Sequence, residues 1–108
     1  GKRDKIIQLT GNAKEILNDL NETYDLVFID ADKENYIGYF NQVSERLNEN
    51  GIIISDNVLW SGKVVDSSLE KDEETNALVN FNKILNEDKR FETVILPLRD
   101  GLSISRLI

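Results

Sequence analysis

Side chains that offer oxygen atoms follow two apolar segments of the chain. Asp30 comes directly after residues 26–29, and the pair Asp56 and Asn57 follows residues 52–54. Because ligands of a parallel sheet bind beyond the carboxyl ends of its strands, we expect these side chains to meet at one edge of the sheet. Carboxylate and amide oxygens suit a hard divalent cation, with Mg²⁺ as the first candidate and Ca²⁺ or Mn²⁺ as alternatives. The alternative interpretation is structural: Asp30 caps a helix, and Asp56 and Asn57 form a turn.

Four further side chains could take part in chemistry. Lys33 could serve as a base if the cation and burial favour its neutral form; otherwise it is a solvated lysine at the start of a helix. Asp32 could bind a polar or cationic group of a ligand, or it could simply be a carboxylate near a helix amino terminus. Trp60 is either an aromatic wall for a planar substrate or a loop anchor. Asp100 is foremost a turn residue.

The composition narrows the kinds of chemistry that remain. The 108 residues include no cysteine and no histidine, which excludes a disulfide framework, a thiolate nucleophile and an imidazole base. The net charge of −7 argues against a nucleic-acid surface, because phosphate binding needs basic side chains. No signal peptide or membrane span is visible, so we expect a cytoplasmic protein without a membrane partner. Carboxylates, amides, hydroxyls, lysine and arginine are left to do the chemistry.

Strand and helix patterns alternate along the chain, which predicts an α/β fold with a mostly parallel sheet and right-handed crossovers. The turn signal at Asp100 and Gly101 adds an antiparallel hairpin at the carboxyl end. No glycine-rich strand-to-helix turn for a ligand phosphate is present. Strands are predicted at residues 5–9, 26–29, 52–54, 91–98 and 102–107, and helices at residues 13–20, 36–50 and 73–86, with a long loop over residues 57–72.

Five details of this prediction concern single residues or one face of an element. Asn12 is expected to cap the first helix, and Pro97 is expected to mark an irregular strand end. The strand at residues 26–29 is an unbroken apolar run, which favours burial on both faces. Gly51 is expected to take a left-handed conformation where the second helix ends. The apolar stripe of that helix is expected to consist of Tyr36, Tyr39, Phe40, Val43 and Leu47.

Three segments together resemble a known enzyme family. Residues 24–36, 56–62 and 96–102 are similar to the metal-dependent O-methyltransferases, the class I S-adenosylmethionine-dependent enzymes related to catechol and caffeoyl-CoA O-methyltransferases. The three motifs occur in the right order, and the resemblance covers essentially the whole chain. It implies a Rossmann-like methyltransferase sheet. It also implies that residues 1–108 form one partial domain, the carboxyl-terminal half of the family domain, with the amino-terminal half absent.

The resemblance assigns roles at the strand ends. The equivalents of Asp30, Asp56 and Asn57 bind the divalent cation, and the equivalent of Lys33 is the proposed catalytic base. The side chains that the resemblance places toward the acceptor substrate are Lys33, Trp60 and Asp100.

The resemblance also implies a site for the methyl donor, S-adenosylmethionine. The resemblance places Asp30 and Asp32 among the residues that bind the donor. The acid matching Asp32 contacts the donor or neighbouring groups. Gly11, Asn12 and Ala13 match a Gly-Asp-Ala segment that holds the adenine. Asn12 stands where that segment has an aspartate, and this difference changes the hydrogen bonds available to the adenine.

The implied reaction is methyl transfer to a hydroxyl group of a catechol-like or other small aromatic acceptor. A cation that holds two adjacent hydroxyls makes them more acidic, and Lys33 takes the proton. The resemblance suggests a homodimer. Because the glycine-rich donor loop belongs to the absent half, we expect the chain alone to be inactive. The sheet edge beside residues 26–29 would then be exposed and would invite pairing with another chain.

Other functions are weighed against this one. A tRNA hydroxyuridine could be the methyl acceptor, but no basic patch supports it. A phosphate-accepting receiver module would share the apolar strand that ends in Asp30. It would also need an acidic pair after its first strand and a lysine after its last parallel strand, and residues 10–12 and 96–98 supply neither. A non-catalytic interaction module is the third alternative.

Overall fold

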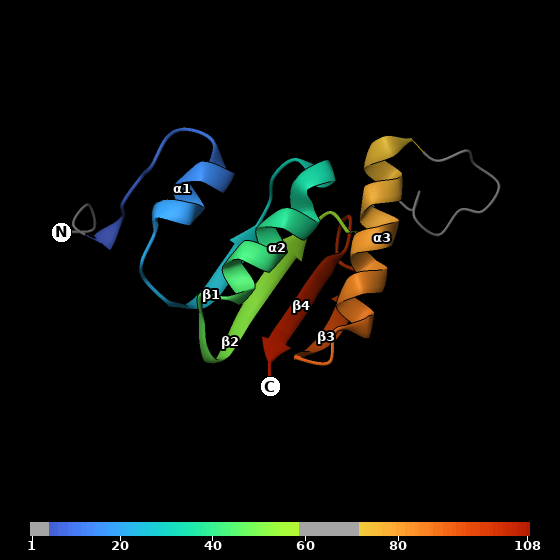
Figure 1. The fold of residues 1–108 in the computed structure, drawn as a ribbon. Helices are drawn as coiled ribbons and strands as arrows, with labels where there is room; N and C mark the ends of the chain where they lie inside the picture. The colour runs from blue at the N-terminus through green and yellow to red at the C-terminus, as the bar shows by residue number, and fades with distance from the viewer. Residues whose placement is uncertain (1–4, 59–71) are drawn as a thin grey trace.

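A computed structural model describes residues 5–58 and 72–108 (Figure 1). The sheet has the strand order β1-β2-β4-β3, in which β1 and β2 are parallel and both contacts of β4 are antiparallel. The predicted α/β fold with a carboxyl-terminal antiparallel hairpin is therefore confirmed. In chain order the elements are α1 (Ala13–Asp19), β1 (Tyr24–Ile29), the short 3₁₀ helix η2 (Lys33–Asn35), α2 (Tyr36–Ser44), β2 (Leu47–Asp56), α3 (Glu73–Glu87), β3 (Phe91–Leu96) and β4 (Leu102–Leu107).

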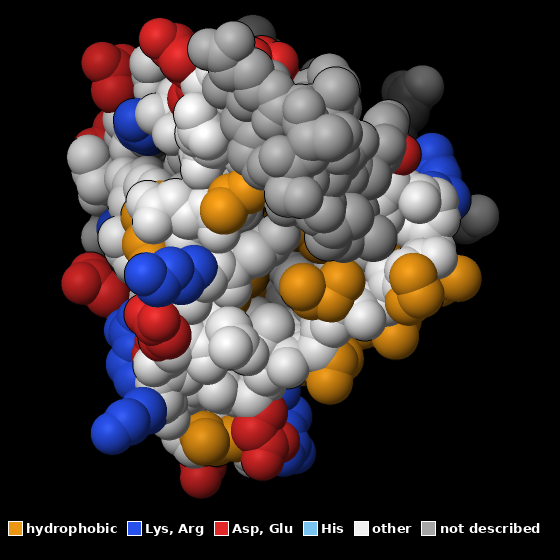
Figure 2. Space-filling view, turned by 90° about the vertical axis from the view of Figure 1, so that its right-hand side faces the viewer, with side chains coloured by type: hydrophobic (Ala, Val, Ile, Leu, Met, Phe, Trp, Pro, Cys, Tyr) orange, Lys and Arg blue, Asp and Glu red, His pale blue; other side chains and the backbone are white. Residues whose placement is uncertain are grey.

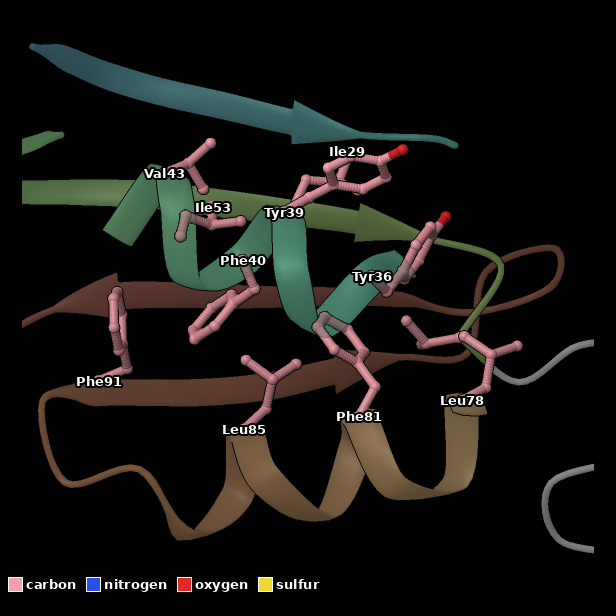
Figure 3. Close-up of a cluster of buried hydrophobic side chains, with 11 residues drawn as sticks. Ile29, Tyr36, Tyr39, Phe40, Val43, Ile53, Leu78, Phe81, Leu85 and Phe91 are labelled. Atoms are coloured by element: carbon pink, nitrogen blue, oxygen red, sulfur yellow. The ribbon is translucent and has the colours of Figure 1, made fainter. Parts of the chain in front are cut away.

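The core lies between one face of the sheet and the two helices α2 and α3. Figure 3 shows aromatic rings of α2 and α3 meeting above the strands. Phe81 of α3 packs edge-on against Tyr36 and Phe40 of α2, with ring centroids 5.3 and 5.9 Å apart. Phe40 also packs against Phe91 at the start of β3, at 5.1 Å. This aromatic cluster fixes the start of α2 over the carboxyl ends of β1 and β2.

The opposite face of the sheet carries apolar side chains that stay partly or largely exposed. Leu26 and Phe28 of β1 and Val94 of β3 are each more than half exposed. They share this face with Ile54 and Ile104, because the register aligns them across the four strands. Figure 2 shows hydrophobic side chains at the surface of the molecule. The prediction that residues 26–29 are buried on both faces is therefore wrong for this chain, since α2 and α3 both pack on the other face.

The predicted strand at residues 5–9 is also wrong. Lys5 lies in a 3₁₀ turn and residues 6–10 are irregular, with Ile6 and Ile7 exposed. An apolar run becomes a strand only when a neighbouring strand accepts and donates its backbone hydrogen bonds. Within the described residues the sheet ends at β1, so this run has no such neighbour.

The second helix is shorter than predicted. It ends at Ser44, and Leu47 begins β2, where it pairs with Tyr24 of β1. The register shifts after this pair, and Asn50 takes the positive φ of 61° that was predicted for Gly51. Glycine is needed at position 51 for another reason: a Cβ there would lie 2.9 Å from the carbonyl oxygen of Asn48. The spacing that placed Leu47 on a helical stripe served a strand equally well.

The remaining elements follow the predicted chemistry. The Oδ1 of Asn12 accepts a hydrogen bond from the backbone N–H of Lys14 and so caps α1. β3 ends before Pro97, and the turn to β4 contains two residues with positive φ, Arg99 and Gly101. β4 has the predicted bounds and α3 differs from its prediction by one residue. None of the described helices has the length and apolar character needed to cross a membrane.

Candidate active site

The carboxyl ends of β1 and β2 bring three predicted site residues together. Ile29 and Ser55 are paired in the parallel register, so the residues that follow each strand lie at the same edge of the sheet. The side-chain amide of Asn57 donates to Oδ1 of Asp30 at 3.3 Å, and the Lys33 ammonium lies 3.7 Å from the same oxygen. Asn57 has a positive φ of 60°, which turns the chain sharply after β2. The edge predicted from the sequence thus contains the predicted side chains.

Asp56 belongs to the same edge. Its Oδ1 accepts a hydrogen bond from the backbone N–H of Asn57 at 2.8 Å. The oxygen-bearing groups of Asp30, Asp56 and Asn57 are a donor set that fits a hard divalent cation. In the described part of the chain, no three acidic, histidine or cysteine side chains converge as a metal-binding group. A cation here would accordingly rest on two carboxylates and one amide, and the amide of Asn57 would have to turn its oxygen toward the ion.

Lys33 is a buried cation beside an exposed acid. Its side chain is 7% exposed, whereas that of Asp30 is 53% exposed. The ammonium donates to the carbonyl oxygen of Ala31 at 3.1 Å and to the hydroxyl of Tyr36 at 2.6 Å. It also lies 4.5 Å from the centre of the Tyr36 ring, within the range of a cation–π interaction. The interpretation of Lys33 as a solvated lysine is therefore wrong.

Tyr36 was assigned only to the core from the sequence, yet it contacts the site directly. Its hydroxyl donates to the backbone carbonyl of Asp56 at 2.8 Å while it accepts from Lys33. Burial raises the pKa of Tyr36 and the nearby Asp30 charge acts in the same direction, whereas the hydrogen bond from Lys33 acts against them. The spacing of three residues between Lys33 and Tyr36 was the signal that could have linked them.

Asp32 is held by neighbours from two helices. Its carboxylate accepts hydrogen bonds from the hydroxyl of Tyr39, at 2.7 Å, and from the side-chain amide of Asn35. These two bonds lower the pKa of Asp32 below its usual value of 3.8. Lys14 of α1 donates to the side-chain oxygen of Asn35. The network keeps Asp32 anionic and ties α1 to the start of α2.

Two adjoining cavities lie between α1 and this polar cluster. One, of about 310 Å³, has mainly apolar walls from α1, β1 and α2 and reaches Asp30. The other, of about 470 Å³, includes Lys14 and Asp32. Both share Gly11 and Ala13 in their walls. All the residues predicted to bind the methyl donor line one cavity or the other: Gly11, Asn12, Ala13, Asp30 and Asp32.

The hairpin turn lies beside the end of β2. The backbone N–H of Val58 donates to the carbonyl oxygen of Gly101 at 3.2 Å, and Asp56 pairs with Leu102. Asp100, which precedes this contact, is partly exposed in the turn. The predicted aromatic wall, Trp60, lies outside the described residues.

The sequence profile of the family described as O-methyltransferase matches residues 1–108. The chain belongs to the O-methyltransferase family. This confirms the resemblance seen in the three motifs, two of which supply the strand ends of the site.

Two similar relatives of this O-methyltransferase chain are plant enzymes. It is 37% identical over 118 residues to caffeoyl-CoA O-methyltransferase 1 of Eucalyptus globulus, across the whole chain and 48% of the relative. It is 36% identical over 119 residues to caffeoyl-CoA O-methyltransferase 5 of Nicotiana tabacum, across the whole chain and 50% of that protein. The chain therefore spans about half the length of the curated relatives it matches.

Solved structures share the fold. The SAH-bound methyltransferase PaMTH1 of Podospora anserina has a TM-score of 0.82 and 29% identity, with 99% of this chain and 53% of that protein covered. The O-methyltransferase of Bacillus cereus, in complex with SAH, has a TM-score of 0.76 and 27% identity, with 88% and 45% covered. The O-methyltransferase chain thus carries the fold of about half of each structure.

Proposed function

We propose that this chain supplies the cation site, the base and part of the donor site of an S-adenosylmethionine-dependent O-methyltransferase. The acceptor is a small aromatic molecule with adjacent hydroxyl groups, such as a catechol. One observation carries the proposal: the buried side-chain nitrogen of Lys33 lies 3.7 Å from the exposed carboxylate of Asp30, beside Asn57 at the end of the neighbouring strand. A base, a carboxylate and an amide at one sheet edge are the groups that this transfer needs.

The proposed donor site is supported by the relatives and by the cavities. SAH, which both named structures hold, is what remains of S-adenosylmethionine after its methyl group has left. Asp32 is a fixed anion in the cavity wall, suited to a hydroxyl or ammonium group of the donor. The oxygen of Asn12 is engaged in capping α1, so its amide nitrogen is the group that would meet the adenine.

The proposed cation would be held by Asp30, Asp56 and Asn57. When bound, Mg²⁺ would supply positive charge that makes a hydroxyl of the acceptor more acidic. The two carboxylates supply negative charge that favours a divalent ion, and the half-exposed side chain of Asp30 faces solvent, from which water or substrate could enter.

Lys33 is the proposed proton acceptor, and the step requires its side chain to be present as the neutral amine. A neutral amine has two N–H bonds and one lone pair. The carbonyl of Ala31 and the hydroxyl of Tyr36 are acceptors for two N–H bonds, and the lone pair takes the proton of the attacking hydroxyl. The hydroxyl oxygen then forms its bond to the methyl carbon as the carbon–sulfur bond of the donor breaks, and SAH leaves.

We also propose that the 108-residue chain needs a further polypeptide partner for activity. β1 forms one edge of the described sheet, and Leu26 and Phe28 beside this edge are exposed. Such an edge is suited to pairing with another strand, from the rest of the protein or from a second copy in a homodimer. The 108-residue chain alone is expected to show no micromolar binding of S-adenosylmethionine in a calorimetric titration.

The test uses the intact protein that contains these residues. Its methyl transfer from S-adenosylmethionine to caffeoyl-CoA is measured with Mg²⁺, with EDTA and after Mg²⁺ is restored. We expect activity with Mg²⁺, loss with EDTA and recovery on restoration. Asp30→Asn should lower the activity and raise the Mg²⁺ concentration needed for half of it. Methyl transfer that EDTA leaves unchanged would contradict the cation site, and an absence of transfer to any vicinal diol would contradict the acceptor class.

A further inference from the structure

The hydroxyl group of Tyr36 joins two parts of the site. It accepts a hydrogen bond from Lys33 at 2.6 Å and donates one to the backbone carbonyl of Asp56 at 2.8 Å. The side chain is fully buried, and its ring has Lys33 over it and Phe81 at its edge. Figure 3 shows this ring at the start of α2, next to Phe81 and Leu78 of α3. The position of the hydroxyl is therefore set by packing on several sides.

The ammonium of Lys33 needs such a partner to stay in place. A lysine side chain has four rotatable bonds, and ordering it carries a large entropic penalty. Its distance of 3.7 Å from Asp30 is beyond hydrogen-bond range, so this contact alone leaves the direction of the ammonium open. The bond to Tyr36, at 2.6 Å, is shorter than the bond to Ala31, at 3.1 Å, and its acceptor oxygen is held by a rigid ring.

The second hydrogen bond of the hydroxyl ties Lys33 to the end of β2. Asp56 is the last residue of β2, and it is held in the sheet by its pairing with Leu102. Lys33 belongs to the connection between β1 and α2. Because one hydroxyl contacts both, the base cannot shift relative to the end of β2 without breaking one of the two bonds.

We infer that Tyr36 is a positioning residue of the methyl-transfer site: it holds Lys33 at a fixed place relative to Asp56. The inference rests on the proposed function of Lys33 as the base. A side chain that orients a catalytic group through a hydrogen bond typically contributes about tenfold to hundredfold to activity. Tyr36→Phe keeps the ring with its contacts to Lys33 and Phe81, and removes only the hydroxyl.

The kinetic test uses Tyr36→Phe in the intact protein. Tyr24→Phe is the matched control, because it makes the same chemical change at the first residue of β1, at the end of that strand away from Asp30. With S-adenosylmethionine, Mg²⁺ and caffeoyl-CoA, Tyr36→Phe should lower kcat about tenfold to hundredfold and leave the KM of S-adenosylmethionine within about twofold. Tyr24→Phe should leave both constants unchanged. An unchanged kcat in folded Tyr36→Phe would overturn the inference.

A second test does not depend on activity. Reductive dimethylation of lysines, followed by peptide mass spectrometry, compares buried Lys33 with the exposed Lys83 and Lys89 in one sample. In the parent protein Lys33 should react several-fold more slowly than the other two. In Tyr36→Phe its rate should rise several-fold while Lys83 and Lys89 keep theirs. Lys33 that stays equally protected in the folded variant would overturn the inference.

If Tyr36→Phe does not fold, the parent protein still decides the question. Proton NMR should show a slowly exchanging hydroxyl proton on Tyr36 with a nuclear Overhauser effect to the Hε protons of Lys33, and the absence of this effect would overturn the inference. The two proposals also fail separately. A parent protein that transfers no methyl group refutes the proposed function, whereas lysine labelling and NMR continue to test whether Tyr36 holds Lys33.

Discussion

Two cation–carboxylate pairs lie at opposite ends of the sheet, and their burial is reversed. At the carboxyl ends of β1 and β2, Lys33 is 7% exposed and Asp30 is 53% exposed, with 3.7 Å between nitrogen and oxygen. At the other end, where α3 turns into β3, Asp88 is 14% exposed and Arg90 is 54% exposed, at 2.7 Å. Arg90 also donates through Nε and its backbone N–H to the same carboxylate.

The difference supports the proposal that Lys33 and Asp30 are arranged for a ligand, whereas Arg90 and Asp88 form a structural pair. The guanidinium of Arg90 binds both oxygens of Asp88, so the pair satisfies itself and closes the turn before β3. The ammonium of Lys33 donates instead to Ala31 and Tyr36, which leaves the carboxylate of Asp30 facing solvent. An acid that faces solvent beside a buried cation is available to an external ligand.

The largest expected effect comes from removing the buried amino group of Lys33. Lys33→Met should lower kcat of the intact protein by about 10²–10⁴-fold, the usual contribution of a positioned acid or base. Arg90→Met, the same type of change at the other end of the sheet, should leave kcat unchanged. Steady-state assays with S-adenosylmethionine and caffeoyl-CoA compare the two. If Lys33→Met keeps more than a tenth of the parent kcat, Lys33 is not the base.

The next prediction compares the aromatic packing beside Tyr36 with the aromatic packing at the start of β3. Phe81 and Phe91 are both buried, and each contacts Phe40. Alanine at either position should lower the free energy of unfolding by about 3–5 kcal/mol in urea titrations. Only Phe81 also touches the ring of Tyr36, so Phe81→Ala should lower kcat of the folded fraction as well. Equal kcat values in the two variants would contradict a role for this packing in the site.

Elements with local signals could be predicted from the sequence. The hairpin follows from Asp100 and Gly101 with alternating side chains after them, and α3 follows from its apolar spacing. The run at residues 5–9 could not be assigned correctly, because a strand depends on a neighbour that its own residues do not specify. The prediction that Leu47 belongs to the second helix was wrong for a related reason, because one apolar residue fits the period of a helix or of a strand.

The candidate site also contains features that the sequence predicts and features that depend on residues distant in the sequence. That Asp30 and Asn57 meet follows from the order of strands in a parallel pair, and the structure contains this contact. The burial of Lys33 could not be predicted, because it depends on Tyr36 and α3 closing over the connection after β1. Tyr36 was placed in the core because an aromatic residue on a helical stripe looks the same whether or not its hydroxyl has a partner.

A smaller effect tests whether every acid near the carboxyl ends of β1 and β2 takes part in the proposed chemistry. Asp72 precedes α3, and its carboxylate accepts a hydrogen bond from the backbone N–H of Thr75 at 2.8 Å. Asp72→Ala should lower the free energy of unfolding by about 1 kcal/mol through loss of this cap and leave kcat unchanged. Glu73→Ala, in the exposed first turn, is the matched control and should change stability less. A large fall in kcat for Asp72→Ala would mean that the reversed burial of Lys33 and Asp30 does not single out the functional acid.

The smallest expected effect concerns the pair at the far end. The hydrogen bond from Arg90 holds the pKa of Asp88 below its usual value of 3.8. A carboxyl group with a lowered pKa in the folded protein stabilises the fold above its unfolded pKa, and this stabilisation is lost as the pH falls through the folded value. Arg90→Met should therefore lower the free energy of unfolding by at most about 1 kcal/mol at pH 7, since Arg90 is largely exposed, and the difference from the parent should vanish at acidic pH.

Urea titrations at pH 7 and at successively lower pH values measure this difference, and carbon NMR of the Asp88 carboxyl follows its pKa, which should rise in Arg90→Met. Arg106→Met is the control, because Arg106 pairs with Glu92 at 2.7 Å on exposed side chains of β4 and β3. Its effect on stability should be smaller still. A difference between Arg90→Met and the parent that grows as the pH falls would show that Asp88 is not stabilised as an anion. The pair at the far end would then no longer serve as the structural reference for Lys33 and Asp30.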